Sequence, residues 1–234
     1  MDEDTLIDAR DGIRYRTVQI GAQRWLAENL KYLPTVCPAT AAPDGSPRHY
    51  VYDYPGRDVG AARATAHYRR YGALYNWPAA LAACPPGWHL PSDEEWSELV
   101  DFLIRRHGDC APNTAAYALK ASLPAEGGNE RERWDLATPG PGERGLVPAC
   151  RRAVRRMLDQ TPAGRNTDRF GFAALPGGRC TYGGFYRLGE LGYWWTRTEA
   201  SPLRAWCRQM TPAGTVNRWD MNKQYGYSVR CIRD

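Results

Sequence analysis

Residues 84–108 read CPPGWHLPSDEEWSELVDFLIRRHG, and this stretch carries the clearest local structural signal in the chain. Ser92 and Glu95 have the spacing of a capping box, in which each side chain bonds the backbone N–H of the other residue. Apolar residues then follow with the spacing of an amphipathic helix, at positions 96, 99, 100, 103 and 104. Gly108 is typical of a residue just past a helix end. The stretch predicts a helix over about 93–107.

Upstream, residues 11–30 (DGIRYRTVQIGAQRWLAENL) predict an N-terminal β-hairpin. A turn signal at Asp11-Gly12 is followed by alternating residues, with positions 13, 15, 17 and 19 on one side of a strand. Gly21 then interrupts the run before a second short strand around Trp25.

The segment between the hairpin and the helix has a weaker pattern. Residues 33–70 are rich in Pro, Ala, Arg and Tyr with little periodicity, and we expect a long surface loop there. Residues 71–83 (YGALYNWPAALAA) have apolar residues at helical spacing, although Pro78 fits only if a new turn starts near it.

The chain downstream of the helix has two kinds of sequence pattern. Residues 108–146 are irregular, and residues 148–159 (PACRRAVRRMLD) predict a short basic helix. We interpret its arginines as a solvated face on an insertion, with a partner- or anion-binding face as the alternative. From Phe170 onward, short β-type runs alternate with glycine turns. The stretch NRWDMNKQYG (217–226) lacks clear strand alternation, and we expect it to behave as a loop.

This order of elements favours an α+β fold in a single domain over residues 1–234, with irregular insertions at about 33–70 and 139–166. A strand pair, two helices and several strands in succession are typical of helices packed on twisted antiparallel sheets. The N-terminal and C-terminal strands are expected to pair and close the domain. The 234 residues, 43% hydrophobic and 24% charged, are enough to bury a core.

The net charge is confined to the C-terminal part. Residues 179–234 hold nine Lys+Arg and four Asp+Glu, which accounts for the whole +5 of the chain, and ten of its 27 aromatic residues. Trp, Tyr and Arg dominate binding hot spots because they combine large rigid area with a polar tip. We therefore predict a ligand-binding face within residues 179–230. Its candidate residues are Arg179, Tyr182, Tyr186, Arg187, Glu190, Tyr193, Arg197, Arg204, Trp206, Arg208, Asn217, Arg218, Trp219 and Asp220.

Seven widely spaced cysteines (37, 84, 110, 150, 180, 207 and 231) suggest long-range disulfides and an oxidising compartment. The odd number leaves at least one thiol free or paired between chains. Cys110 and Cys150 flank the irregular insertion and could pair. Cys180 and Cys207 fall where we expect ligand-facing positions.

Several blocks in order resemble one known family. They are residues 11–30 and the stretches YGALYNW (71–77), CPPGWHLPSDEEW (84–96), FGFAALPGGR (170–179), GYWWTRTE (192–199) and GYSVRCIRD (226–234). Together they are similar to the FISUMP domain, the Fibrobacter major paralogous domain. The 33–70 segment and the insertion near 139–166 depart from its pattern.

The resemblance implies a C-type-lectin-like fold, related to that of formylglycine-generating enzymes, and a location at the cell surface or outside the cell. It also implies a disulfide between Cys84 and Cys231. Some family members are variable proteins of diversity-generating retroelements, whose C-terminal regions are mutated to create new ligand specificities. We therefore expect a non-enzymatic, receptor- or adhesin-type module that binds a protein or glycan on another cell, phage or host.

Other functions have weaker support. No HExxH, GxSxG, P-loop or dinucleotide motif occurs, and the two nearby cysteines of formylglycine-generating relatives have no counterpart. A calcium-dependent lectin needs clustered oxygen ligands, and no EPN- or QPD-type tripeptide is present. We predict no cofactor and no metal. We also predict no nucleic-acid partner, because Lys is scarce and the net charge is modest for a nucleic-acid-binding domain. No apolar run reaches the ~20 residues of a membrane span. The acidic start is unlike a signal peptide, which suggests a chain that is not secreted or one that begins after processing.

His89 is expected to form structural hydrogen bonds. The sequence leaves the oligomeric state open.

Overall fold

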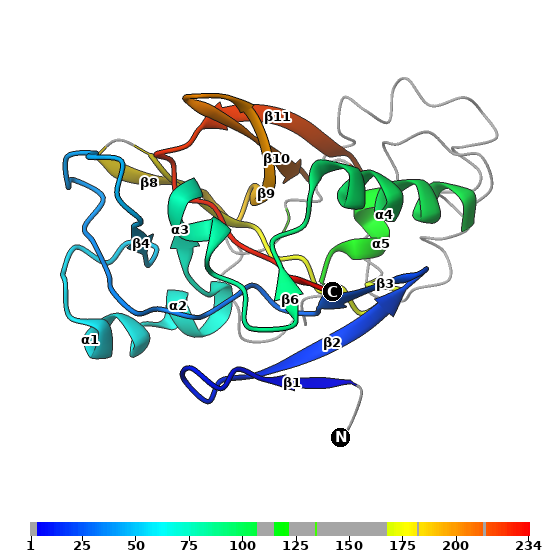
Figure 1. Ribbon diagram of the computed structural model, residues 1–234, viewed down its shortest axis with the longest axis horizontal. Coiled ribbons are helices and arrows are strands. Elements are labelled where there is room, and N and C mark those ends of the chain that lie inside the picture. The colour runs from blue at the N-terminus through cyan, green and yellow to red at the C-terminus, as the bar shows by residue number, and fades with distance from the viewer. Residues whose placement is uncertain (1–3, 107–114, 122–133, 135–167, 182, 213) are drawn as a thin grey trace.

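The computed structural model describes residues 4–106, 115–121, 134, 168–181, 183–212 and 214–234. They form a mixed α+β arrangement of mostly antiparallel, curled sheets with few helices, as the α+β prediction requires (Figure 1). Five helices are described rather than the expected two, because four short helices of five or six residues accompany one longer helix. None of the helices in the described ranges is long and apolar enough to cross a membrane.

The first sheet joins the two ends of the chain. Its order is β1-β2-β3-β12-β6, and its strands are Thr5–Ile7 (β1), Arg14–Ile20 (β2), Gln23–Leu26 (β3), Ile232–Arg233 (β12) and Trp88–His89 (β6). Ile232 pairs with Trp25 on one side and with His89 on the other. The expected pairing of N-terminal with C-terminal strands is confirmed, because β12 pairs with β3.

The predicted N-terminal hairpin is β2 and β3, and its alternation holds only in part. Tyr15 and Thr17 are buried as expected, but Ile20 takes the next inward position and Gln19 is exposed. The strand therefore changes phase near Val18, just before the turn. The exposed Gln19 amide donates to the carbonyl of Gly21 within that turn, at 3.1 Å.

The predicted helix is α4, Asp93–Arg106. Its capping box is formed as expected, because the Ser92 N–H donates to Glu95 Oε2 at 2.7 Å and the Glu95 N–H donates to Ser92 Oγ at 3.1 Å. The apolar stripe of the helix is buried against β9, β10 and the short helix α5, Ala115–Leu119.

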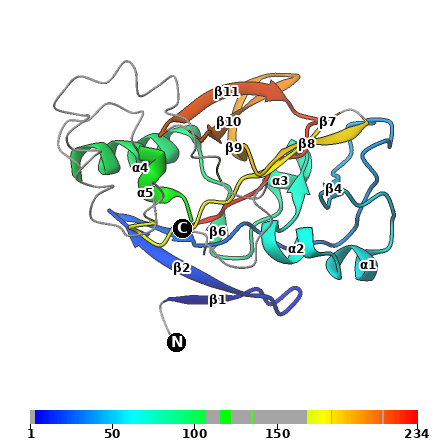
Figure 2. The same cartoon turned by 180° about the vertical axis from the view of Figure 1, so that it is seen from behind.

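The second sheet follows the order β11-β10-β9-β7-β8. Its strands are Gly177–Thr181 (β7), Gly184–Leu188 (β8), Gly192–Ser201 (β9), Arg204–Met210 (β10) and Val216–Asn222 (β11). Their neighbours pair antiparallel, apart from the parallel contact between β7 and β9. The expectation of a loop over 217–226 was wrong for its first six residues, which form most of β11. Figures 1 and 2 place β10 and β11 on the side of the molecule away from β1 and β2.

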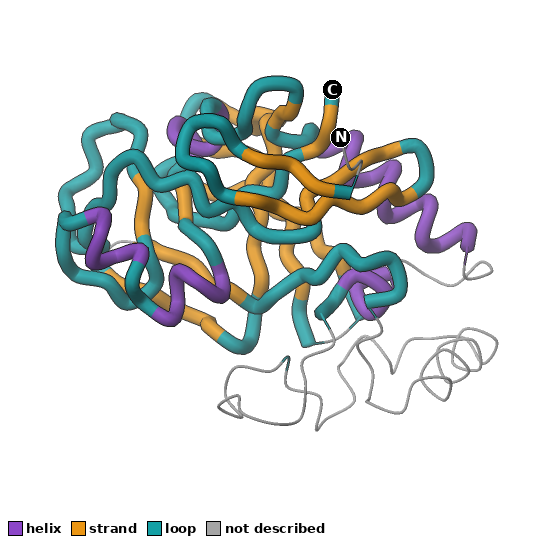
Figure 3. The backbone as a smooth tube through the Cα atoms, turned by 90° about the horizontal axis from the view of Figure 1, so that it is seen from below, coloured by secondary structure: helices purple, strands orange, loops and turns teal. Residues whose placement is uncertain are grey.

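The prediction of a surface loop over 33–70 was wrong. The segment contains His49–Tyr50 (β4), Val59–Arg63 (α1) and most of Ala66–Tyr71 (α2). Its apolar side chains enter the core, with Leu33, Val36, Val51, Ala62 and Tyr68 all buried. α1 and α2 lie at the opposite end of the molecule from α4 (Figure 3).

Residues 71–83, whose apolar residues have helical spacing, form a strand followed by a helix. Leu74–Tyr75 form β5, and a new helix, α3, spans Trp77–Leu81. Asn76 caps α3, because its Oδ1 accepts from the Ala79 N–H at 3.1 Å. Pro78 therefore lies in the first turn, where the missing N–H costs nothing.

Two adjacent tryptophans on β9 hold cores on opposite faces of the second sheet. Trp195 packs with Tyr75 and Tyr227, while Trp194 packs with Trp96 and Phe172. Both side chains are fully buried.

One disulfide crosses the fold. Cys84 and Cys231, 147 residues apart, are bonded as the family resemblance implied. Cys37, Cys180 and Cys207 are free thiols. The suggested Cys110–Cys150 pair, the basic helix at 148–159 and the insertion at 139–166 lie outside the described residues.

Candidate binding surface on the C-terminal sheet

The pairing of β10 with β11 determines which predicted residues share a face. Side chains opposite each other in a ladder project to the same side of the sheet. One side carries the pairs Trp206↔Asp220 and Arg208↔Arg218, and the other carries Cys207↔Trp219 and Gln209↔Asn217. The predicted residues therefore divide between two faces of one hairpin, and we call these the helix-side face and the strand-side face.

On the helix-side face, Arg218 is held between an aromatic ring and a carboxylate. Its guanidinium lies 3.5 Å from the centre of the Trp206 ring, a cation–π contact. Its Nε donates to Asp93 Oδ2 at 2.5 Å. The side chain is still 46% exposed. Arg218 is thus fixed in one orientation while the edge of its guanidinium remains open to solvent.

Arg208 was predicted to face a ligand, and the structure contradicts this. Its side chain is 6% exposed, because α4 covers it. Its guanidinium donates to Asp93 Oδ1 at 2.9 Å, to the Asp93 carbonyl at 2.7 Å and to Ser97 Oγ at 2.8 Å. Burial lowers the pKa of Arg208, and Asp93 acts in the opposite direction. Arg208 is therefore a structural cation between sheet and helix.

A second ion pair lies further along the same face. Arg204 Nε donates to Asp220 Oδ2 at 2.8 Å, and both side chains are nearly half exposed. The hydrogen bond from Arg204 holds the pKa of Asp220 below its usual value. Arg197, on β9, is exposed as predicted. These groups offer donors and acceptors to a ligand at little desolvation cost.

On the strand-side face, Trp219 is 48% exposed. Its indole Nε1 donates to Gln209 Oε1 at 3.1 Å, and the Asn217 amide donates to the same oxygen at 3.1 Å. The ring is thereby oriented by one glutamine while a large part of its surface faces solvent.

The β7–β8 hairpin adds Arg179 and Tyr186, which pair across it and so share a face. Tyr186 is 47% exposed. The Arg179 guanidinium lies 5.4 Å from the centre of the Tyr193 ring. Tyr193 itself was predicted as ligand-facing, and this was wrong. It is 2% exposed and stacks on Tyr227 with ring centres 4.9 Å apart.

The next predicted pair joins the end of β8 to the turn that follows it. Arg187 donates to Glu190 Oε2 at 2.7 Å, and both side chains are exposed. Tyr182 lies outside the described residues.

The two cysteines expected near ligand-facing positions are buried instead. Burial raises the pKa of the Cys180 thiol to about 12 and that of Cys207 further. Both therefore remain protonated at neutral pH and act as small apolar side chains.

Sequence reasoning missed two residues that organise this surface, Asp93 and Gln209. Asp93 stood in the sequence as part of the helix start, and only the fold brings it to Arg208 and Arg218. Gln209 carries no signal of its own, although its position two residues from Cys207 places it on the strand-side face.

Among the residues that the structure describes, no group of three or more His, Cys, Asp or Glu side chains could hold a metal ion. His89 bridges two carboxylates, with Nδ1 at 2.6 Å from Asp234 Oδ1 and Nε2 at 2.8 Å from Glu95 Oε1. These bonds join β6 to α4 and to the C-terminal residue.

The comparison with protein families gives one match. The model of the Fibrobacter succinogenes major domain aligns with residues 18–233, which is most of the chain. No curated protein and no solved structure gives a significant match.

Proposed function

Because this chain belongs to the Fibrobacter succinogenes major domain family, we propose that it is a ligand-binding module rather than an enzyme. The binding surface is the exposed part of the β9–β11 sheet and the β7–β8 hairpin. Its residues are Arg179, Tyr186, Arg187, Glu190, Arg197, Arg204, Trp206, Asn217, Arg218, Trp219 and Asp220.

One observation carries the proposal. Large, polar and charged side chains project from a backbone whose pairing is complete between β10 and β11, and buried residues support it from beneath. Arg218 and Trp219 are each oriented by a hydrogen bond and remain about half exposed. Pre-organised aromatic and Arg side chains bind with a small loss of conformational entropy, which favours recognition.

The chemistry of the surface fits a protein or a glycan. Aromatic faces pack on apolar ring or side-chain surfaces, and the ion pairs Arg204–Asp220 and Arg187–Glu190 can exchange partners with a polar ligand. We further propose a C-type-lectin-like fold and a location at the cell surface or outside the cell, where the Cys84–Cys231 disulfide is stable. The ligand is then carried by another cell, a phage or a host.

Two alternatives have less support. An oxidoreductase like the formylglycine-generating enzymes needs reactive thiolates, whereas burial keeps Cys180 and Cys207 protonated. A calcium-dependent lectin needs several oxygen ligands converging on one ion. The carboxylate of Asp220 is instead engaged by Arg204, and that of Asp93 by two arginines.

Binding is tested with the double variant Arg218→Ala/Trp219→Ala on an array of protein-linked glycans and on intact bacterial cells. The matched control is Ile7→Ala/Arg14→Ala, an exposed apolar–arginine pair opposite each other on β1 and β2. We expect the surface variant to fold and to lose at least tenfold in affinity for whatever the wild-type chain captures. Equal binding by the two variants would contradict the proposal.

We also propose that the surface is diversified by a retroelement. This depends on the genome rather than on the fold. Sequencing beside the gene should find a reverse transcriptase and a near-identical copy of its 3′ end. If both are absent, the proposal of diversification is wrong, and the proposal of a binding module is unaffected.

A further inference from the structure

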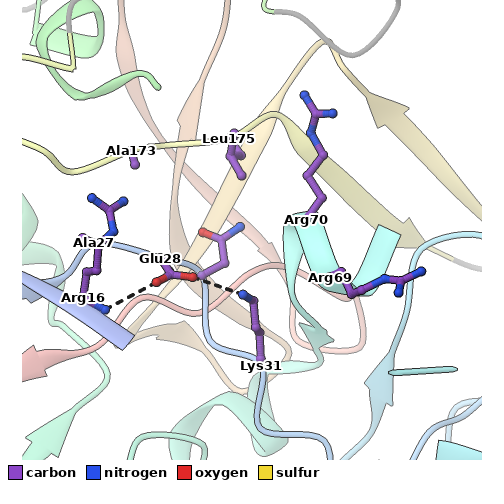
Figure 4. Close-up of a pocket in the computed structure, with 9 residues that line it drawn as sticks. Arg16, Ala27, Glu28, Lys31, Arg69, Arg70, Ala173 and Leu175 are labelled. Atoms are coloured by element: carbon purple, nitrogen blue, oxygen red, sulfur yellow. Dashed lines mark hydrogen bonds and ion pairs between the residues drawn. The ribbon is translucent and has the colours of Figure 1, made fainter. Parts of the chain in front are cut away.

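A hollow of about 280 Å³ lies on a different part of the molecule from the C-terminal surface. It is enclosed by β2, by the segment that follows β3, by α2 and by the chain leading into β7 (Figure 4). Nine residues line it: Arg16, Ala27, Glu28, Asn29, Lys31, Arg69, Arg70, Ala173 and Leu175. Figure 1 places β2 and α2 well away from β10 and β11. No residue of the proposed binding surface lines this hollow.

Four cationic side chains and one carboxylate line the hollow, and the Arg69 side chain points away from that carboxylate (Figure 4). Glu28 lies in the middle and accepts from Lys31 Nζ at 3.1 Å and from the Arg16 backbone N–H at 3.4 Å (Figure 4). Burial is the largest single influence on the pKa of Glu28 and works against its ionisation, but Lys31 and Arg16 together outweigh burial and hold the pKa of Glu28 below its usual value. Glu28 and Lys31 therefore neutralise each other, and the remaining charge of the hollow is positive.

The positive charge that remains is carried by guanidinium groups. Within the described ranges, neither Arg16 nor Arg69 has a carboxylate at ion-pair distance. Figure 4 shows Arg16 on one side of Glu28, with Arg69 and Arg70 on the other side, leaving α2 in different directions. Exposed side chains change rotamer within nanoseconds, so Arg69 can reorient toward a ligand. A guanidinium fork matches the two oxygens of a carboxylate.

A buried arginine contacts Asn29, one of the residues that line the hollow. Arg230 is fully buried, and it donates to Asn29 Oδ1 at 2.9 Å while stacking 4.3 Å from the Phe172 ring centre. Burial lowers its pKa to about 9, so it is still charged at neutral pH. Asp168 acts on it only at longer range. A charge in the interior is poorly screened by solvent, and it raises the positive potential at Asn29.

The rest of the wall is apolar or accepts hydrogen bonds. Ala27, Ala173 and Leu175 supply carbon surface, and the Glu28 carboxylate supplies an acceptor beside the cations. A bare inorganic anion would use only the cations. A ligand that carries a carboxylate, hydroxyl donors and a C–H face would use all three kinds of group.

We propose that this hollow binds one sugar-acid unit of the hexuronate class, with its carboxylate between Arg16 and Arg69. A hydroxyl of the sugar donates to Glu28, and the C–H face of the ring packs on Ala173 and Leu175. The volume suits a single small unit, either free or as the end of an acidic oligosaccharide.

Isothermal titration calorimetry at low ionic strength with D-glucuronate, D-glucose and sodium sulfate tests the proposal. We expect glucuronate to bind at least tenfold more tightly than either of the other two. Arg16→Ser and Arg69→Ser should each weaken glucuronate on the order of tenfold, since each removes a charge-assisted hydrogen bond. The matched control, Arg14→Ser, replaces an exposed arginine on the same strand and should leave binding unchanged. A further titration with digalacturonate tests whether the ligand is the end of an acidic oligosaccharide or the free acid. If it is the end of an oligosaccharide, the disaccharide should bind at least as tightly as the free acid.

Three results overturn the proposal: sulfate binding as tightly as glucuronate, no binding of glucuronate, or equal losses in Arg14→Ser and Arg16→Ser. Thermal melting of each variant verifies folding. Arg69 lies on a short surface helix, so a folding defect in Arg16→Ser, on the sheet, need not occur in Arg69→Ser.

The Arg218→Ala/Trp219→Ala variant should bind glucuronate normally. A failure of the hexuronate proposal can therefore be distinguished from a failure of the proposed C-terminal binding surface.

Discussion

The carboxylate of Asp93 accepts a hydrogen bond from Arg208 at 2.9 Å, although the two residues are 115 positions apart. Asp93 begins α4 and Arg208 lies in β10, so this pair joins the longest described helix to the second sheet. Both side chains are 6% exposed. The same carboxylate orients Arg218 at the surface, which couples the buried pair to the proposed binding face.

Replacing Asp93 with Asn should strongly destabilise the protein. The variant leaves the Arg208 guanidinium buried without a counter-charge, and breaking a buried pair in this way costs about 3–5 kcal/mol. Urea unfolding at pH 7 measures the loss. The control, Asp220→Asn, removes an exposed carboxylate and should change stability little. Similar losses in the two variants would show that the buried pair has no special role.

Removing the Cys84–Cys231 disulfide should lower the free energy of unfolding by about 2–5 kcal/mol, because the bond restricts a long loop in the unfolded chain. Cys84→Ser/Cys231→Ser and Cys37→Ser are compared in urea with and without reductant. Reductant should bring the wild type and Cys37→Ser to the stability of the double variant. It should change the double variant far less than the wild type, because the Cys84–Cys231 bond is already absent from that variant.

Stability should fall as the solution is acidified from pH 6.5 towards pH 4, in part because of His49. Burial lowers the pKa of His49 to about 4 in the folded protein, whereas an unfolded histidine titrates near 6.5. Between these values the unfolded chain binds the proton and the folded chain does not, so acid favours unfolding. His49→Asn should lose less stability than the wild type between pH 7 and pH 4.5. If the wild type and His49→Asn lose the same stability over this pH range, His49 does not contribute to the acid destabilisation.

Gly178→Ala should disrupt the β7–β8 hairpin, which carries Arg179 and Tyr186. Gly178 has φ +66°, and an added Cβ would lie 2.6 Å from the Tyr186 carbonyl oxygen. Strain of this kind costs about 1–3 kcal/mol. Gly183→Ala is the matched control, because its φ is +80° with open space around the site. Thermal melting should show the larger loss for Gly178→Ala, and the reverse order would contradict the steric argument.

Trp219→Ala should change stability far less than Trp195→Ala. Trp195 is fully buried and donates to the Tyr75 carbonyl at 2.8 Å, whereas Trp219 is 48% exposed. Truncating a core tryptophan costs about 3–5 kcal/mol. Comparable losses in urea would mean that Trp219 belongs to the scaffold rather than to the binding surface.

The sequence predicts best those elements whose stability is local. The α4 helix carries its own capping box and apolar stripe, so both its start and its buried face follow from the residues alone. Residues 33–70 differ because their helices and strands are two to six residues long, too short to repeat a period. Distant contacts hold them in place, such as the Arg48 N–H donating to Asn76 Oδ1 at 2.8 Å.

The binding surface was predictable in composition but not residue by residue. Arg208 and Arg218 lie opposite each other on the same face of the hairpin, yet only Arg208 is covered by α4. Nothing in the local sequence separates them, because the covering helix lies more than a hundred residues away. Tyr193 was misassigned for a similar reason, since its stacking partner Tyr227 lies outside its own strand and later in the chain.

The position of the disulfide determines how the domain would respond to mechanical load. A pulling force on the two ends of this chain passes through the covalent link between Cys84 and Cys231, so the intervening residues bear none of it. The whole second sheet and α4 lie between those cysteines. Tension on the two ends of the chain would therefore peel β1–β3 away from β12 while the Trp- and Arg-bearing hairpin kept its shape.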